Sequence, residues 1–203
     1  MYGGVDAVAA PLDRTDGEDQ RGEDAAFMTM DRKTMIGELG ADGPNPSTPE
    51  PLDLFGQFVG AWELEWRGKG RAGALGSVRG ELHVGWVLDG RAIQDIWRVP
   101  LDPLDAGLMR AFHGTTIRFY DPRIEAWRST WLDPLNGRVR RFIGRSIGDS
   151  ILLDGLDQDP QERWSFRDMT SNSFRWRGEE SIDGGQTWVL NDEMYATRMQ
   201  PQP

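Results

Sequence analysis

Residues 115–132 (TTIRFYDPRIEAWRSTWL) constrain the fold of this chain more than any other stretch. Two runs of alternating side chains, rich in aromatic and β-branched residues, flank the dipeptide Asp121-Pro122. Such period-2 alternation is typical of β-strands, and Asp-Pro between two runs favours a turn. The stretch therefore predicts an antiparallel hairpin.

The same alternation recurs toward the C-terminus and also precedes this hairpin, and turn dipeptides such as Asp89-Gly90 and Asn136-Gly137 separate the runs. The predicted strands cover residues 61–67, 78–88, 91–99, 115–120, 127–131, 138–145, 150–156, 162–169, 173–182 and 187–199. Short strands joined by short turns predict a meander, and closure would remove its exposed edges. We expect an all-β fold, a closed antiparallel up-and-down barrel of about nine or ten strands.

The N-terminal quarter of the chain has a different composition. Residues 1–50 hold eleven Asp or Glu and four Lys or Arg, a balance of −7 within a total of −10. All nine tryptophans lie from Trp62 onward. We predict an acidic, flexible tail and Pro-rich linker over residues 1–49, largely disordered, and a barrel domain over residues 50–199. Apolar spacing over residues 52–59 predicts a short helix that caps the barrel.

Composition also excludes several classes of protein. The chain has no cysteine, which rules out disulfides and a thiol nucleophile. No basic patch favours nucleic acid or an anionic membrane surface, and no run approaches the roughly 20 apolar residues of a membrane span. The first residues lack the pattern of a signal peptide, so we expect a cytoplasmic protein. A homodimer stays open.

Four short motifs, in order along the chain, carry a resemblance to a known family. They are Gly60-Ala61-Trp62, residues 85–91 (GWVLDGR), residues 119–122 (FYDP) and residues 183–188 (DGGQTW). With them, residues 50–198 resemble an uncharacterised bacterial family of lipocalin-like barrels of the calycin superfamily. The resemblance implies a closed barrel with an internal cavity and no agreed activity. Nitrobindin-type barrels share this architecture and bind haem through a histidine. This chain has only His83 and His113, neither near the C-terminus, so we expect no haem, no metal and no other cofactor.

Residues 181–188 (SIDGGQTW) also match the Asp-box of sialidase propellers. A propeller would carry several copies at a regular period, and this chain has one. We therefore interpret the motif as a stabilised hairpin.

Aromatic side chains on the predicted strands are the main signal of function. Tryptophans alternate with other residues on several strands, and such rings either fill a barrel or line a cavity for a flat apolar ligand. Two tyrosines are candidates to donate hydrogen bonds to that ligand. The candidate ligand-binding aromatic residues are Trp97, Trp127, Trp131, Trp164, Trp176, Tyr120 and Tyr195.

Charged residues on apolar strand faces are a second signal. Asp95, Arg141 and Glu180 each share a face with apolar neighbours, and a buried charge is costly unless it is paired. Arg141 either pairs with one of the two acids or binds an anionic group of the ligand. Asp95, Glu180 and His113 are candidate catalytic acids or bases. The other strand arginines are expected on the solvated outer face: Arg118, Arg128, Arg140, Arg145, Arg163, Arg167, Arg175 and Arg177.

Three functions remain open from the sequence. The first is a barrel that binds a small, largely apolar or aromatic, possibly anionic molecule. The second is a cofactor-free isomerase, cyclase or lyase on the same scaffold. The third is an interaction module that recruits a partner through its acidic tail.

Overall fold

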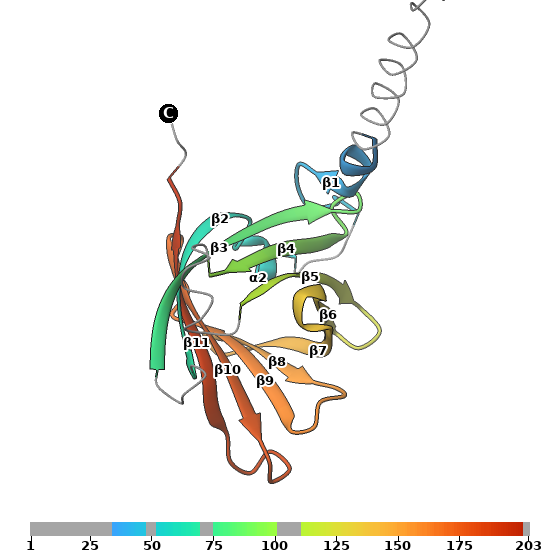
Figure 1. The fold of residues 1–203 in the computed structure, drawn as a ribbon. Coiled ribbons are helices and arrows are strands. Elements are labelled where there is room, and N and C mark those ends of the chain that lie inside the picture. The colour runs from blue at the N-terminus through green and yellow to red at the C-terminus, as the bar shows by residue number, and fades with distance from the viewer. Residues whose placement is uncertain (1–33, 48–51, 70–74, 101–110, 201–203) are drawn as a thin grey trace, which may run out of the picture. The chain divides into compact units, whose positions relative to one another are not determined.

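Residues 34–47, 52–69, 75–100 and 111–200 are described in the computed structural model (Figure 1). Residues 1–33 and 48–49 of the predicted flexible tail, which covers residues 1–49, lie outside them. The chain divides into two compact units, Met1–Glu38 and Leu39–Pro203. Residues 34–39 are helical.

Within the described residues, ten antiparallel strands close into a barrel. Each strand pairs with its neighbours in sequence, and the last pairs with the first, which is the expected up-and-down order. The strands are β2 (Gly60–Lys69), β3 (Leu75–Val87), β4 (Ala92–Val99), β5 (Phe112–Asp121), β6 (Ala126–Asp133), β7 (Arg138–Ile147), β8 (Ser150–Gly155), β9 (Gln161–Arg167), β10 (Ser173–Ser181) and β11 (Val189–Arg198). The predicted fold class is confirmed.

Part of the predicted linker adds to this barrel. The short strand β1 (Gly40–Ala41) pairs with the end of β3, beyond the point where β2 begins. Asn45 then binds the β3–β4 turn, donating from Nδ2 to the Asp89 backbone oxygen at 2.9 Å. A Cβ at Gly90 would overlap the backbone of residues 43–45, and its φ of +70° favours glycine. The boundary between tail and barrel at residue 49 stays a prediction.

The turns form as their residues predict. Asp121 accepts hydrogen bonds from Arg123 and from Arg128 across the first hairpin. In the Asp-box sequence, Asp183 accepts from the Thr187 amide at 2.9 Å, and Ser181 Oγ accepts from the Gly185 amide at 2.9 Å. The interpretation of this motif as a stabilised hairpin is confirmed.

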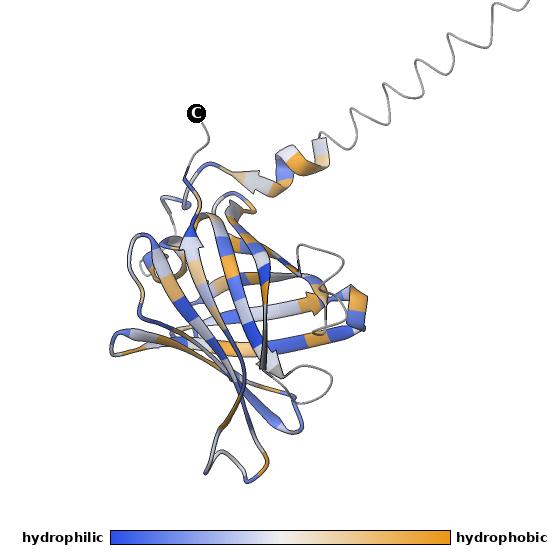
Figure 2. Cartoon of the chain, turned by 60° about the vertical axis from the view of Figure 1, so that its left-hand side comes forward, coloured by the Kyte–Doolittle hydropathy of each residue, from blue (hydrophilic) through white to orange (hydrophobic). Residues whose placement is uncertain are grey.

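Alternation of hydropathy along the strands, visible as alternating colours in Figure 2, places apolar side chains inside the barrel. The short helix α2 (Asp53–Gly56) contributes Phe55 to one part of this core. Phe55 and Phe58 pack against Trp127, Phe166 and Phe174, with ring centroids 4.8–5.9 Å apart. The predicted capping helix is therefore present, and it fills this part of the interior.

Candidate functional site

A cavity of about 430 Å³ occupies the part of the barrel that α2 does not fill. Its wall is largely aromatic, and each of its apolar side chains comes from a different strand: Trp66, Trp97, Phe112, Trp131, Trp164, Trp176 and Met194. Period-2 alternation explains why they meet, since each occupies an inward position of its strand. For example, Trp66 on β2 is paired with Met194 on β11, which is paired in turn with Trp176 on β10.

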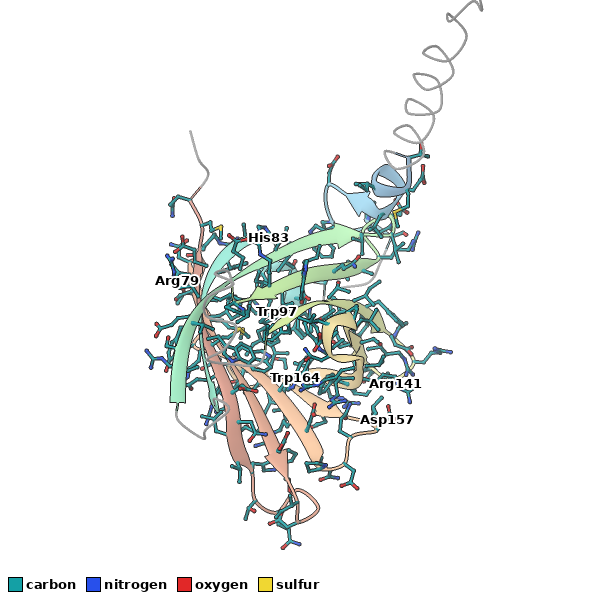
Figure 3. All side chains as sticks on the ribbon, in the orientation of Figure 1. Arg79, His83, Trp97, Arg141, Asp157 and Trp164 are labelled. Carbon is teal, nitrogen blue, oxygen red and sulfur yellow. The ribbon has the colours of Figure 1, made fainter. Side chains whose placement is uncertain are left out.

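The tryptophans contact one another instead of packing on aliphatic side chains alone. The Trp176 ring lies 5.3 Å from that of Trp164 and 5.4 Å from that of Trp66, between centroids. Trp97 and Trp131 are in an edge-to-face arrangement at 6.3 Å. Figure 3 shows Trp97 and Trp164 inside the barrel. Aromatic rings held by other rings form a rigid wall, which suits a flat ligand.

Polar side chains cover one side of the cavity. Arg138 and Arg140 extend from β7, and Asp133 lies opposite Arg138 on β6. The remaining polar residues of the wall come from β9, β10 and β11: Glu162, Glu179, Glu180, Asn191 and Asp192. The cavity is thus lined by apolar, mostly aromatic side chains and by charged side chains.

Arg140 and Glu162 form the central ion pair of the charged wall. Arg140 Nε donates to both carboxylate oxygens of Glu162, at 2.9 and 3.0 Å. The pair spans two strands because β8, which lies between them, ends at Gly155, opposite Phe142 and before the level of Arg140. Burial raises the pKa of Glu162 above its ordinary value, and the charge of Glu180 adds to this effect, while Arg140 opposes it.

Glu180 lies directly opposite Glu162, as the paired residue on β10. It is half-buried, and within the described residues no ion pair or hydrogen bond of its carboxylate is found. Glu179, its neighbour, pairs instead with Arg163 at 3.1 Å and Arg177 at 3.7 Å.

The structure brings five of the predicted site residues together. Trp97, Trp131, Trp164, Trp176 and Glu180 line the cavity. Their shared inward position follows from the alternation that suggested them. The binding and catalytic roles assigned to these residues stay predictions.

The other predicted aromatic residues lie elsewhere. Trp127 is 1% exposed and packs against Phe55 in the filled part of the barrel. Tyr120 packs beside Trp127. Tyr195 lies on the outer face, where its hydroxyl donates to Glu193 at 3.1 Å.

The predicted charged residues are also partly displaced. Arg141 points away from the cavity and pairs with Asp157 at 2.7 Å on the exposed surface (Figure 3). Arg140, expected outside, takes the inward position of β7 because the buried Phe142 fixes that strand's parity. His113 is exposed and paired with Arg98 on the outer face.

Asp95 is buried, as its apolar neighbours predict, but outside the cavity wall. Its partner is Arg118, which donates from Nη1 to Asp95 Oδ2. Their side chains are 2% and 3% exposed. The prediction that Arg118 lies on the solvated face is therefore wrong: the register of β5 against β4 turns Thr116, Arg118 and Tyr120 inward.

Sequence reasoning missed several residues of the wall, and strand parity would have found three of them. Trp66 is four residues from Trp62 on one strand, and Glu162 is two residues from Trp164. Arg138 shares the parity of Phe142. Phe112 is the first residue of β5, and Asn191 and Asp192 lie at the register shift between β10 and β11; alternation alone gives little information at either place.

Other kinds of site are not seen in the described part of the chain. Residues 34–47, 52–69, 75–100 and 111–200 contain no cluster of three or more His, Asp or Glu with the geometry of a metal site. None of the helices within these ranges is long and apolar enough to cross a bilayer.

Comparison with solved structures identifies the fold of this barrel. The chain aligns with Rv2717c from M. tuberculosis at a TM-score of 0.51 and 12% identity, covering 75% of this chain and all of that one. It also aligns with the S-type phycobiliprotein lyase CPES from Guillardia theta, at a TM-score of 0.49 and 12% identity, covering 74% and 93% of the two chains. This chain has a lipocalin-like fold.

The expected resemblance to lipocalin-like barrels is thereby confirmed at the level of fold. No model of a protein family matches the sequence. No curated protein matches it either. At 12% identity the alignment with Rv2717c shows the architecture alone, so the function has to be argued from the cavity.

Proposed function

We propose that this protein binds a flat, largely aromatic small molecule inside the barrel. The observation that carries the proposal is the cavity of about 430 Å³ bounded by five tryptophans. Pockets for small molecules commonly measure about 300–1,000 Å³ and combine an apolar wall with a few polar groups. The aromatic wall would contact the faces of the ligand, and the charged wall would orient its polar end.

The filled part of the barrel supports this assignment. Phe55 and Phe58 close the interior beside Trp127 with tightly packed rings. A barrel that needed only stability could fill its remaining interior in the same way, since voids cost packing energy. The rigid, hollow part is therefore best explained by an occupant.

The test is a binding measurement with a matched pair of variants. Trp164→Ala removes one ring of the cavity wall, whereas Trp188→Ala removes a tryptophan of the outer hairpin that lies against Arg163. For any aromatic compound that binds the wild type, calorimetry should show about tenfold weaker binding to Trp164→Ala, the equivalent of about 1.4 kcal/mol. Binding to Trp188→Ala should be unchanged. The proposal would be contradicted if both variants lowered the affinity equally. It would also be contradicted if no compound of a broad aromatic set bound saturably to the wild type.

Cofactor-free acid–base catalysis in the same cavity is the second candidate, as an isomerase, cyclase or lyase reaction. It is favoured by Glu162, whose pKa is raised by burial beside the carboxylate of Glu180. Asp95 is held by Arg118 and His113 lies outside, so of the three predicted catalytic residues it is Glu180 that lines the cavity. Liquid chromatography coupled to mass spectrometry, which also separates isomers of equal mass, distinguishes the two after incubation: a ligand is recovered unchanged, and a substrate is converted at a rate that Glu180→Gln lowers.

A further inference from the structure

Arg138 and Glu180, two charged residues of the cavity wall, have opposite surroundings. Arg138 on β7 faces a carboxylate, because its paired residue on β6 is Asp133. Glu180 on β10 faces a second carboxylate, because its paired residue on β9 is Glu162. Like charges directly opposite each other in a sheet repel, whereas opposite charges attract. Arg138 therefore has a residue of opposite charge directly across the sheet, whereas Glu180 has a residue of the same charge.

The remaining charged groups do not reverse this balance. Arg140 is engaged by both oxygens of Glu162, and Glu179 is engaged by Arg163 and Arg177. Glu180 is left as an acid of the wall with neither an ion pair within the described residues nor a base opposite it on the sheet. The field beside Glu180 therefore favours cations over anions.

Aromatic faces lie beside the uncompensated carboxylate. Trp164 is two residues from Glu162 on β9, and Trp176 is four residues from Glu180 on β10, with Gly178 between them. A Cβ at Gly178 would approach the Trp176 ring to 2.8 Å, so glycine keeps this part of the wall close-fitting and free of a side chain. Indole faces attract cations through the ring quadrupole, and tryptophan does so best among the aromatic side chains.

We propose that the preferred ligand is a flat aromatic amine or nitrogen heterocycle that carries one positive charge. Its protonated nitrogen contacts the Glu180 carboxylate, and its rings lie against Trp164 and Trp176. The inference rests on the proposed function and narrows it to one class of ligand. Arg141, which had suggested an anionic ligand, lies outside the cavity and gives that alternative no support.

A matched series of three compounds separates charge from shape. 1-Naphthylmethylamine is a cation near neutral pH, 1-naphthylmethanol is neutral, and 1-naphthylacetate is an anion, all on the same ring system. Calorimetry with the full chain at low salt should give about tenfold tighter binding of the cation than of the alcohol, as one charged hydrogen bond provides. The anion should bind more weakly than the alcohol. Added salt should weaken binding of the cation most.

Two isosteric variants locate the effect. Glu180→Gln should weaken binding of the cation about tenfold and leave binding of the alcohol within about twofold. Glu63→Gln makes the same charge change on the exposed outer face of β2, and it should leave the affinity for all three compounds unchanged.

Other binding results would overturn the inference alone or the inference together with the proposed function. Tighter binding of the anion, lost in Arg138→Gln, would overturn the inference and assign the site to anionic ligands. Equal binding of all three compounds, or a preference for the cation that survives Glu180→Gln, would overturn the inference and leave the proposed function standing. Saturable binding of none of the three would count against both.

Discussion

Replacing Asp95 by Asn should destabilise the barrel strongly, because among the described residues Asp95 is the one anion in contact with the buried Arg118 guanidinium. The carboxamide oxygen of the variant would still accept the hydrogen bond that the Thr116 amide donates to Oδ1 of Asp95 at 2.7 Å, so the change removes only the charge and the acceptor that Arg118 uses. Arg118 Nε and Nη2 have no hydrogen-bond partner in the described part of the chain. Removing one partner of a buried ion pair costs about 3–5 kcal/mol.

Aromatic contacts set the lower bound of that loss. The Arg118 guanidinium lies 5.1 Å from the centre of the Phe55 ring and 5.8 Å from that of Phe166. Such contacts contribute about 2 kcal/mol for a desolvated cation, less than the cost of leaving its charge unpaired. We therefore expect a loss of at least about 3 kcal/mol, or about 6 °C or more in Tm.

The double variant Asp95→Asn/Arg118→Met supplies the control. It removes the unpaired cation together with its partner, and a flexible apolar side chain then occupies the space. Replacement of both members of a buried pair is often neutral, so its stability should return to within about 1 kcal/mol of the wild type. Urea unfolding followed by tryptophan fluorescence measures the wild type and both variants, with unchanged m-values as evidence of an unchanged fold. A loss below about 1 kcal/mol in Asp95→Asn, or a double variant no more stable than the single one, would refute this reasoning.

Two further predictions concern packing and pH. Gly114→Ala should lower stability by about 1–3 kcal/mol in urea unfolding, because its Cβ would overlap the ring of Trp131 and a backbone carbonyl of β6. Gly85→Ala is the matched control, since a Cβ there meets no atom within 4 Å; equal losses would count against the packing argument. Hydrogen bonds from the side chain and amide of Thr187 lower the pKa of Asp183 to about 2. Because this pKa is depressed on folding, the stabilisation is present above the ordinary pKa of about 4 and is lost as the pH falls toward 2. The Tm of Asp183→Asn should therefore fall less than that of the wild type over this range, and parallel curves would contradict the assignment.

The sequence predicted the barrel well because its strands are marked twice, by alternation and by turn residues. Asp89-Gly90 and Asn136-Gly137 each separate two strands in the structure as in the prediction. The inward face of β4 was also predictable, since Ile93, Asp95 and Trp97 share a parity that the neighbouring polar residues do not.

The candidate site was harder to predict because two strands carry conflicting signals. On β7, Val139 and Arg141 share one face and Arg140 and Phe142 the other, so each face holds an arginine and an apolar residue. On β5, the apolar Phe119 is 43% exposed, whereas Arg118 beside it is buried. Burial of Arg118 requires a carboxylate on the adjacent strand, and only the register of β5 against β4 supplies it. An error in parity moves every side chain of a strand to the other face. For this reason Arg141 was predicted inside the barrel and lies outside, whereas Arg118 was predicted outside and lies inside.

The ion pair of the core and the ligand cavity meet at one side chain. Trp97 lines the cavity on one side, and on the other it borders a void of about 10 Å³ beside Asp95, Arg118 and Phe55. Its position is therefore fixed from the filled part of the barrel, while its neighbours Trp131 and Trp176 belong to the hollow part. A ligand wall that is held by core packing loses little conformational entropy on binding, which is the advantage of a preorganised site. The same arrangement predicts an asymmetry: variants of Asp95 should lower stability and alter ligand affinity, whereas Glu180→Gln should alter affinity without lowering stability, because it removes a like charge opposite Glu162.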